Sequence, residues 1–269
     1  MIASAPDDPS PMIARDDPRT LAAIGVVAAC LASIAHETIG HGVTCLAVGG
    51  TITRLTATHF RCADGTVLVD ALGPAGNLVS AAIAFGLLRT CRGFAQSARL
   101  FLLMLGGINL CWFAGEMIHS ALINSEDEAH LARLLGWPAA WRPIAVAAGV
   151  LIYGTTIRYG AAVARRMVEA GDPPDNLRRR IMIAWAAATA SFAVAGLAWA
   201  RDPFGSAWEC FMTIGVAGVP LWIGVGLMRW PDARPTGRRI GTSTPWTLVA
   251  LLVLGAFVVI QGRGVGPMS

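Results

Sequence analysis

Two histidines and a glutamate lie close together in the first apolar stretch of the chain. The motif runs from His36 through Glu37 to His41, inside an apolar stretch from about Leu21 to Val48 that is long enough to cross a bilayer. Ionisable side chains at membrane depth cost roughly 2.5 to 3.5 kcal/mol each, so they usually mark a metal, a proton path or a substrate site. The motif predicts a metal site.

The spacing of the two histidines permits two ligand geometries. Successive residues of an α-helix are about 100° apart, so His36 and His41, five residues apart, point about 140° away from each other. Glu37 and His41, four residues apart, share a face. Either a π-bulge, which Gly40 could ease, brings the histidines together, or Glu37 and His41 are the helical ligand pair.

Zinc is the metal that suits such side chains. A Zn²⁺ ion takes three of them plus a water, which becomes acidic enough to attack a carbonyl near neutral pH. Glu37 would then be the general base. Candidates for the third ligand are Glu116 and His119, one helical turn apart in the 98–122 segment, and Asp127 and His130 just beyond its end. Glu116 lies at a similar depth in its segment to the two histidines in theirs.

Composition indicates the kind of protein that positions these residues. Hydrophobic residues make up 55% of 269 and charged residues 14%, and the mean hydropathy is +0.57. We therefore expect an all-α polytopic membrane protein, integral and multi-pass, with about seven transmembrane helices. After the first span the apolar windows are 73–91, 98–122, 143–167, 179–200, 207–229 and 244–262.

The basic residues predict the orientation of the chain. All 21 are arginine; 14 lie in the N-terminal tail and the 89–99, 165–180 and 229–239 connections, six lie on the other side, and Arg158 lies within a span. The positive-inside rule then places the N-terminus in the cytoplasm and the C-terminus outside, and we expect a bacterial inner membrane. Residues 1–18 are expected to form a disordered cytoplasmic tail. No nucleic-acid module is visible, so no nucleic-acid partner is expected.

The segment between the first two spans departs from the helical pattern. Residues 51–56 and 66–69 are β-prone and flank Asp64-Gly65, which predicts a short β-hairpin. Cys45 and Cys62 both fall near the predicted outer end of the first span, where a disulfide could persist.

A third motif opens the second apolar window. In Gly73-Pro74-Ala75-Gly76-Asn77, proline suits a first helical turn and the small residues permit close helix packing. The Asn77 amide could hold a substrate backbone, donate to a developing oxyanion, or simply bond another helix.

The order of these features resembles the site-2 protease type of intramembrane zinc metalloprotease. The resemblance covers roughly residues 20 to 130, although that family usually spaces its histidines four apart and takes its third ligand from a Leu-Asp-Gly setting. Divergent relatives with the five-residue spacing have a Gly-Gly after the first span, matched by Gly49-Gly50, and an aspartate after the third core span, which Asp127 resembles. The resemblance implies a zinc-dependent endopeptidase that cuts a membrane-protein or peptide substrate in or near a transmembrane helix.

The predicted organisation is therefore a tail (1–18), a metalloprotease-like core (19–130) and four additional spans (131–269) of the same domain. In this hypothesis His36 and His41 bind zinc, Asp127 or Glu116 completes the site, Glu37 activates water and Asn77 orients the substrate. The alternatives are a seven-span zinc amidohydrolase acting on a lipid, a di-iron protein using Glu116-x-x-His119, and a non-enzymatic transporter or pseudoprotease.

Overall fold

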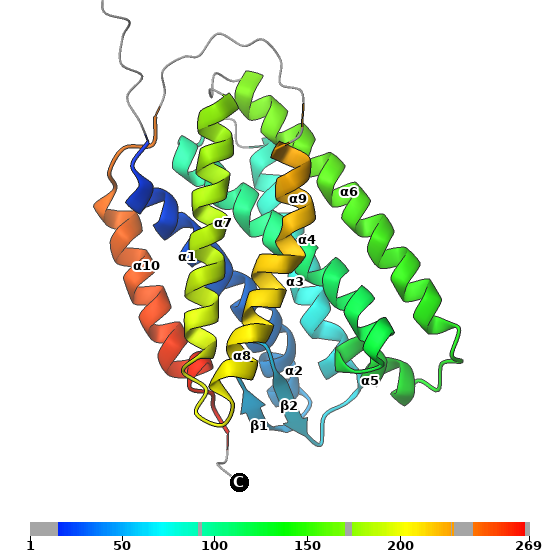
Figure 1. Ribbon diagram of the computed structural model, residues 1–269. Helices are drawn as coiled ribbons and strands as arrows, with labels where there is room; N and C mark the ends of the chain where they lie inside the picture. The colour runs from blue at the N-terminus through cyan, green and yellow to red at the C-terminus, as the bar shows by residue number, and fades with distance from the viewer. Residues whose placement is uncertain (1–15, 91–92, 170–173, 227, 229–238, 267–269) are drawn as a thin grey trace, which may run out of the picture.

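The computed structural model describes residues 16–90, 93–169, 174–226, 228 and 239–266. The tail predicted to be disordered lies almost wholly outside these residues, as does most of the 229–239 connection. The described chain is mostly helical with one two-stranded sheet (Figure 1). Its elements, in order, are α1 (Pro18–Ser33), η1 (Ile34–Val43), α2 (Thr44–Ala47), β1 (Thr51–Leu55), β2 (Phe60–Ala63), α3 (Val67–Thr90), α4 (Gln96–Ile123), α5 (Glu126–Leu134), α6 (Trp141–Glu169), α7 (Pro174–Gly196), α8 (Pro203–Cys210), η2 (Phe211–Val216), α9 (Ala217–Gly226), α10 (Thr244–Phe257) and η3 (Val258–Gly262).

Six helical segments of the described chain are long and apolar enough to cross a membrane, so the protein is of the multi-pass membrane type. They are the continuous helix α1–η1–α2, then α3, α4, α6, the continuous helix α8–η2–α9, and α10–η3. The predicted fifth span corresponds to α7, which is not among these six and carries Asp175 and three arginines in its first turns.

Helix α1 occupies the centre of the bundle, packed against α4, α7 and α10 (Figure 1). Its sequence is rich in alanine, and Leu21, Ile24 and Ala28 are fully buried. A Cβ added to Gly25 would lie 1.9 Å from the carbonyl oxygen of Ala184 on α7, so the two backbones touch at this point. Small residues thus allow the close helix packing that membrane interiors favour.

One end of the bundle is fastened by a buried ion pair between the start of α1 and α7. Both oxygens of Asp16 accept hydrogen bonds from the Arg180 guanidinium, at 2.8 and 2.9 Å, and Oδ1 also accepts from the Ile240 N–H at 2.7 Å. These bonds satisfy a buried charge that would otherwise be very costly. They join the beginning of α1 to α7 and to the segment before α10.

The predicted hairpin is present, but its second strand was wrongly placed. β1 pairs antiparallel with β2, with Thr51 opposite Ala63 and Leu55 opposite Phe60, and residues 56–59 form the connection. The run 66–69 instead enters α3, because Val67 is already helical. The outer edge of β1 is also occupied: Leu55 and Val265 exchange two backbone hydrogen bonds of 2.9 Å each.

The early start of α3 corrects a second prediction. The helix begins at Val67, so Pro74 lies in its interior and not in its first turn. A proline there removes one backbone hydrogen bond and tends to bend the helix. Gly73 and Gly76 consequently lie in mid-helix, where they face η1.

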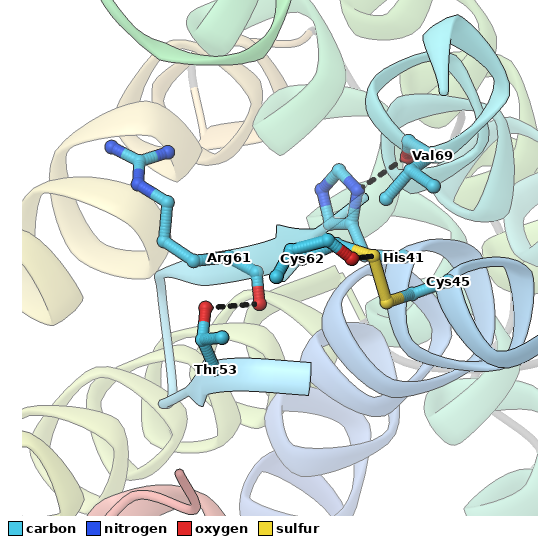
Figure 2. Close-up of a disulfide and its surroundings, with 7 residues drawn as sticks. His41, Cys45, Thr53, Arg61, Cys62 and Val69 are labelled. Atoms are coloured by element: carbon cyan, nitrogen blue, oxygen red, sulfur yellow. Dashed lines mark hydrogen bonds between the residues drawn. A yellow bond between two sulfur atoms is a disulfide. The ribbon is translucent and has the colours of Figure 1, made fainter. Parts of the chain in front are cut away.

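A disulfide joins Cys45 of α2 to Cys62 of β2, as the sequence allowed, with the two Cα atoms 6.0 Å apart (Figure 2). It anchors the hairpin to the end of the first span. Because closing a loop of this length contributes about 3 kcal/mol, we expect Cys45→Ser/Cys62→Ser to lower the midpoint of thermal unfolding in detergent. A reductant should lower the wild-type midpoint equally and leave the double variant unchanged. Equal midpoints in all samples would contradict this role.

Candidate metal centre

The two histidines of the first span meet because this stretch of helix is a π-helix. In η1 the backbone bonds span five residues, so residues five apart come to lie over one another. The Nε2 atoms of His36 and His41 are 3.2 Å apart. This confirms the first of the two geometries that the spacing permitted, in which a π-bulge pairs the histidines.

Close approach of α3 accompanies the π-helix. A Cβ added to Gly40 would lie 2.4 Å from the carbonyl oxygen of Leu72, and one added to Gly76 would lie 2.3 Å from that of Ala35. A Cβ on Gly73 would fall on the His41 ring itself, 2.0 Å from Nε2. The glycines of the His36–His41 motif and of the Gly73–Asn77 motif therefore allow α3 to pack directly against η1, which carries the two histidines.

His41 is held by a hydrogen bond and by a ring stacked against it. Its Nδ1 lies 2.6 Å from the Val69 carbonyl oxygen on α3 (Figure 2). A carbonyl oxygen only accepts, so Nδ1 carries the hydrogen and a neutral ring presents the lone pair of Nε2. The ring of Phe60 on β2 stacks on the imidazole with centroids 5.2 Å apart and planes 8° from parallel.

His36 receives its neighbours from α4. Trp112 stacks on its ring, with centroids 4.9 Å apart and planes 16° from parallel. Glu116, one helical turn further along α4, places Oε2 3.8 Å from Nδ1 of His36. Trp112 and Phe60 were not predicted as site residues. The sequence did offer a signal for Trp112, which lies four residues before Glu116 and therefore on the same face of a helix.

Asp127 brings a third candidate ligand atom to the two histidines. Its Oδ2 lies 2.8 Å from His41 Nε2 and 3.3 Å from His36 Nε2, and its side chain is 19% exposed. His36, His41 and Asp127 form the group of side chains in the described chain that could hold a metal ion. The structure therefore places Asp127 in this group, whereas Glu116 lies beside His36 Nδ1.

The end of α4 folds back to put Asp127 there. Asn124 adopts a left-handed conformation (φ 56°) that ends α4, and α5 begins two residues later. The Ser120 hydroxyl donates to the Ser125 carbonyl at 2.5 Å and accepts from the Ala129 N–H at 3.0 Å. These bonds hold the first turn of α5, which carries Asp127, against the last turn of α4.

The three candidate ligand atoms lie close enough together to share a cation. Because Val69 engages the Nδ1–H of His41, Nε2 of His41 and Oδ2 of Asp127, which are 2.8 Å apart, can share either a proton on Nε2 or a bound cation. A proton can bridge two atoms, whereas here His36 Nε2 lies within 3.3 Å of both. Tetrahedral zinc with bonds near 2.0 to 2.1 Å separates its ligand atoms by about 3.3 Å. The two separations made by His36, 3.2 and 3.3 Å, are close to this value, whereas the 2.8 Å between His41 and Asp127 is shorter.

Electrostatics keep Asp127 suited to this role. Burial on its own raises the pKa of the Asp127 carboxyl, but the positive charge of a protonated His41 and hydrogen bonds from both histidines outweigh it, so the pKa then lies well below its usual range. The group is therefore ionised at neutral pH. An anionic carboxylate beside two imidazoles is a donor set typical of catalytic zinc sites, which leave one position open.

The ligand atoms open onto a cavity of about 670 Å³. Glu37, which is 1% exposed and has one carboxylate oxygen without a hydrogen-bond partner among the described residues, also lines it. The walls come from the hairpin, from α4, α5 and α6, and from the continuous helix α8–η2–α9. The predicted metalloprotease-like core (19–130) and the helices that follow it thus line the same cavity. The lining is mainly apolar and includes Phe60, Trp112, Tyr153, Trp208, Met212 and Val216.

The other candidate residues lie at different places. Asn77 is fully buried, neither amide atom has a hydrogen-bond partner within the described chain, and it is not among the residues lining the cavity, so its substrate role stays a prediction. His119 lines the cavity. His59 pairs with Glu209 at 2.9 Å, and this hydrogen bond raises the pKa of His59. His130 pairs with Asp70 on α3 at 2.8 Å.

Neither a protein-family model nor any of the curated proteins and solved structures compared with the chain matches it. The candidate metal centre therefore stands on the geometry of His36, His41, Asp127 and Glu37 in this chain.

Proposed function

We propose that the protein is a zinc-dependent intramembrane endopeptidase. The observation that carries this proposal is that His36 Nε2, His41 Nε2 and Asp127 Oδ2 come together at the wall of a largely apolar cavity that Glu37 also lines. Zinc held there would supply Lewis acidity that acidifies water and polarises a carbonyl. Glu37 would accept the proton from the attacking water and later deliver it to the leaving amine.

The hairpin favours a peptide over a lipid as the substrate. Thr58 to Arg61 line the cavity, and β2 is paired on one side alone among the described residues. The edge of β1 is already bonded to Val265, which leaves β2 as the edge that could accept an extended peptide. Strand addition would expose a scissile bond that a helix otherwise conceals. A lipid amidohydrolase would have no use for such an edge.

We also propose seven membrane crossings, with α7 as the additional one. Helix α7 begins at the end of the bundle that holds Asp16 and finishes near the hairpin, where Gly196 touches α8 and Arg54 of β1 lies over Trp199. Its 23 residues extend about 34 Å, enough to cross. The Cys45–Cys62 disulfide supports an outer location for the hairpin end and a cytoplasmic N-terminus, since disulfides persist in compartments such as the bacterial periplasm.

Metal analysis of the purified, detergent-solubilised protein tests the proposal. We expect about one zinc per chain in the wild type, because the three donors fit a single site, and none in His41→Ala. His130→Ala is the matched control: this histidine is partly exposed, pairs with Asp70 and should leave the zinc content unchanged. A folded wild-type protein that takes up no zinc from excess would exclude the protease and leave a transporter or pseudoprotease.

Substrate assays then separate the two zinc hydrolases. The zinc-loaded wild type is incubated with apolar transmembrane peptides and, separately, with lipid amides in the same detergent. We expect new amino termini from the peptides and intact lipids. Cleavage of a lipid amide without cleavage of any peptide would establish the amidohydrolase instead.

A further inference from the structure

The Oε2 atom of Glu116 faces the Nδ1 edge of the His36 ring, whereas the Nε2 edge faces the candidate ligand atoms of His41 and Asp127. His36 Nε2 lies 3.2 Å from His41 Nε2 and 3.3 Å from Asp127 Oδ2. Its Nδ1 instead faces Glu116 Oε2 at 3.8 Å. A metal ion bound by His36 Nε2 would therefore lie at the edge of the imidazole opposite to Glu116 Oε2.

The two facing atoms are both buried and both lack a hydrogen-bond partner. Among the described residues, neither His36 Nδ1 nor Glu116 Oε2 makes a hydrogen bond, and the side chains are only 2% and 10% exposed. Buried polar atoms without a partner are rare, because each costs about 1 to 3 kcal/mol. Their separation exceeds a hydrogen bond by about 0.7 Å, a distance that a small rotation of a glutamate side chain removes.

The second histidine, His41, has both a stacked aromatic ring and a hydrogen-bond partner for its Nδ1. His41 is stacked on Phe60 and its Nδ1–H donates to the Val69 carbonyl. His36 is stacked on Trp112, and the group facing its Nδ1 is Glu116, four residues after Trp112 on the same face of α4. Metal-binding histidines regularly donate their other N–H to a carboxylate or carbonyl, which fixes tautomer and orientation.

We propose that Glu116 is a positioning residue of the metal centre, which accepts a hydrogen bond from the Nδ1–H of His36 and is not itself the third ligand. The inference rests on the proposed zinc site and goes beyond it, because it gives α4 a separate task. α4 fixes one histidine through Trp112 and Glu116, whereas α3 and β2 fix the other. Asp127 is then the acidic ligand.

Zinc affinity of three variants tests this assignment. Affinities are measured by competition with a chromophoric chelator for the wild type, Glu116→Gln, Glu116→Leu and Asp127→Asn. A glutamine carbonyl can still accept the Nδ1–H bond, so Glu116→Gln should stay within about 3-fold of the wild type. Glu116→Leu should bind about 10- to 100-fold more weakly, the usual effect of losing a hydrogen-bond partner behind a ligand. Asp127→Asn should lose more than either.

Cobalt(II) substitution adds a reading of the ligand set. Glu116→Gln should reproduce the visible absorption bands of the wild type, whereas removal of a true ligand changes them. A Glu116→Gln protein that loses metal as completely as Asp127→Asn would overturn the proposal and make Glu116 a ligand. Wild-type affinity in Glu116→Leu would also overturn it. If Glu116→Leu does not fold, Glu116→Ala replaces it and is judged by the same criteria.

The outcomes for this inference and for the proposed function are distinguishable. A wild type that binds zinc but hydrolyses nothing refutes the endopeptidase, while the affinity series still decides the role of Glu116. A wild type that binds no zinc refutes both. Hydrolysis by the wild type together with metal loss in Glu116→Gln refutes the positioning role alone.

Discussion

Replacing Glu37 by glutamine is expected to lower the rate of peptide hydrolysis by about 10² to 10⁴, the usual contribution of a general base, while about one zinc per chain remains bound. The carboxylate lines the cavity beside the ligand atoms but is not one of the three that converge. Glutamine keeps its volume and removes its ability to take a proton. Initial rates on a zinc-loaded apolar peptide, with zinc determined by mass spectrometry, give both quantities.

A matched control and two opposing results make this experiment decisive. Glu169→Gln, an exposed position at the end of α6, should hydrolyse and bind zinc like the wild type. If Glu37→Gln loses its zinc, Glu37 is a ligand and the roles proposed for this side chain are wrong. If it retains both zinc and full activity, another group is the base.

Replacing Gly73 by alanine is expected to weaken zinc binding strongly although the substitution adds only one methyl group. The new Cβ would lie 2.0 Å from Nε2 and 2.2 Å from Cε1 of His41, far closer than van der Waals contact allows. His41 cannot turn aside without losing the Val69 hydrogen bond and the Phe60 stack. The methyl group would also push α3 away from η1. We therefore expect zinc affinity to fall by about 10- to 100-fold or more, the usual effect of losing the hydrogen-bond partner of a metal-binding histidine.

Gly86→Ala is the control for Gly73→Ala. Both glycines lie in α3, but a Cβ at position 86 meets nothing within 4 Å. Alanine is a better helix former than glycine by about 1 kcal/mol, so Gly86→Ala should bind zinc normally and be at least as stable. Chelator competition and thermal unfolding measure the two effects. Normal zinc affinity in Gly73→Ala would show that α3 does not lie against His41 as described.

The membrane character and the group of His36, Glu37 and His41 could be read from the sequence because each is a local signal. Apolar windows follow from composition, and three ionisable groups within the first of them stand out. The choice between two ligand geometries could not be made in the same way. It depends on whether the backbone around Gly40 follows an α or a π hydrogen-bond pattern, and in the structure that turn lies against the Leu72 carbonyl of another helix.

Asp127 shows why the third ligand was harder to assign. In the sequence it stands between two other acidic residues, a pattern equally typical of a solvated loop. Its place in the site depends on the left-handed Asn124 and the two hydrogen bonds of Ser120, which fold α5 back against α4. Depth along the predicted span favoured Glu116, and that criterion does place Glu116 beside His36. Depth cannot tell which edge of an imidazole a carboxylate faces.

The hairpin was predicted from β propensity, and its second strand was wrong for a physical reason. Val67 to Val69 suit a strand equally well, but in the fold they begin α3 and place the Val69 carbonyl at His41. Propensity is a weak preference that such tertiary contacts override. The strand that formed instead, Phe60 to Ala63, carries the ring that stacks on His41 and the cysteine that bonds to α2.

The bonds between the hairpin and the last helix affect the order in which the protein can be completed during synthesis. The Gln261 side chain donates to the Thr56 carbonyl and to the Ser33 hydroxyl, at 3.3 Å each, and Val265 bonds to Leu55. Chains fold from the N-terminus as they emerge from the ribosome. His36, His41 and Asp127 are therefore made long before Gln261 and Val265, whose contacts add to the disulfide in holding the neighbouring hairpin. A partly synthesised chain would contain all three candidate ligands while its hairpin still lacked the contacts with Gln261 and Val265. We therefore expect the hairpin beside the metal centre to be less rigid in the partly synthesised chain than in the finished protein.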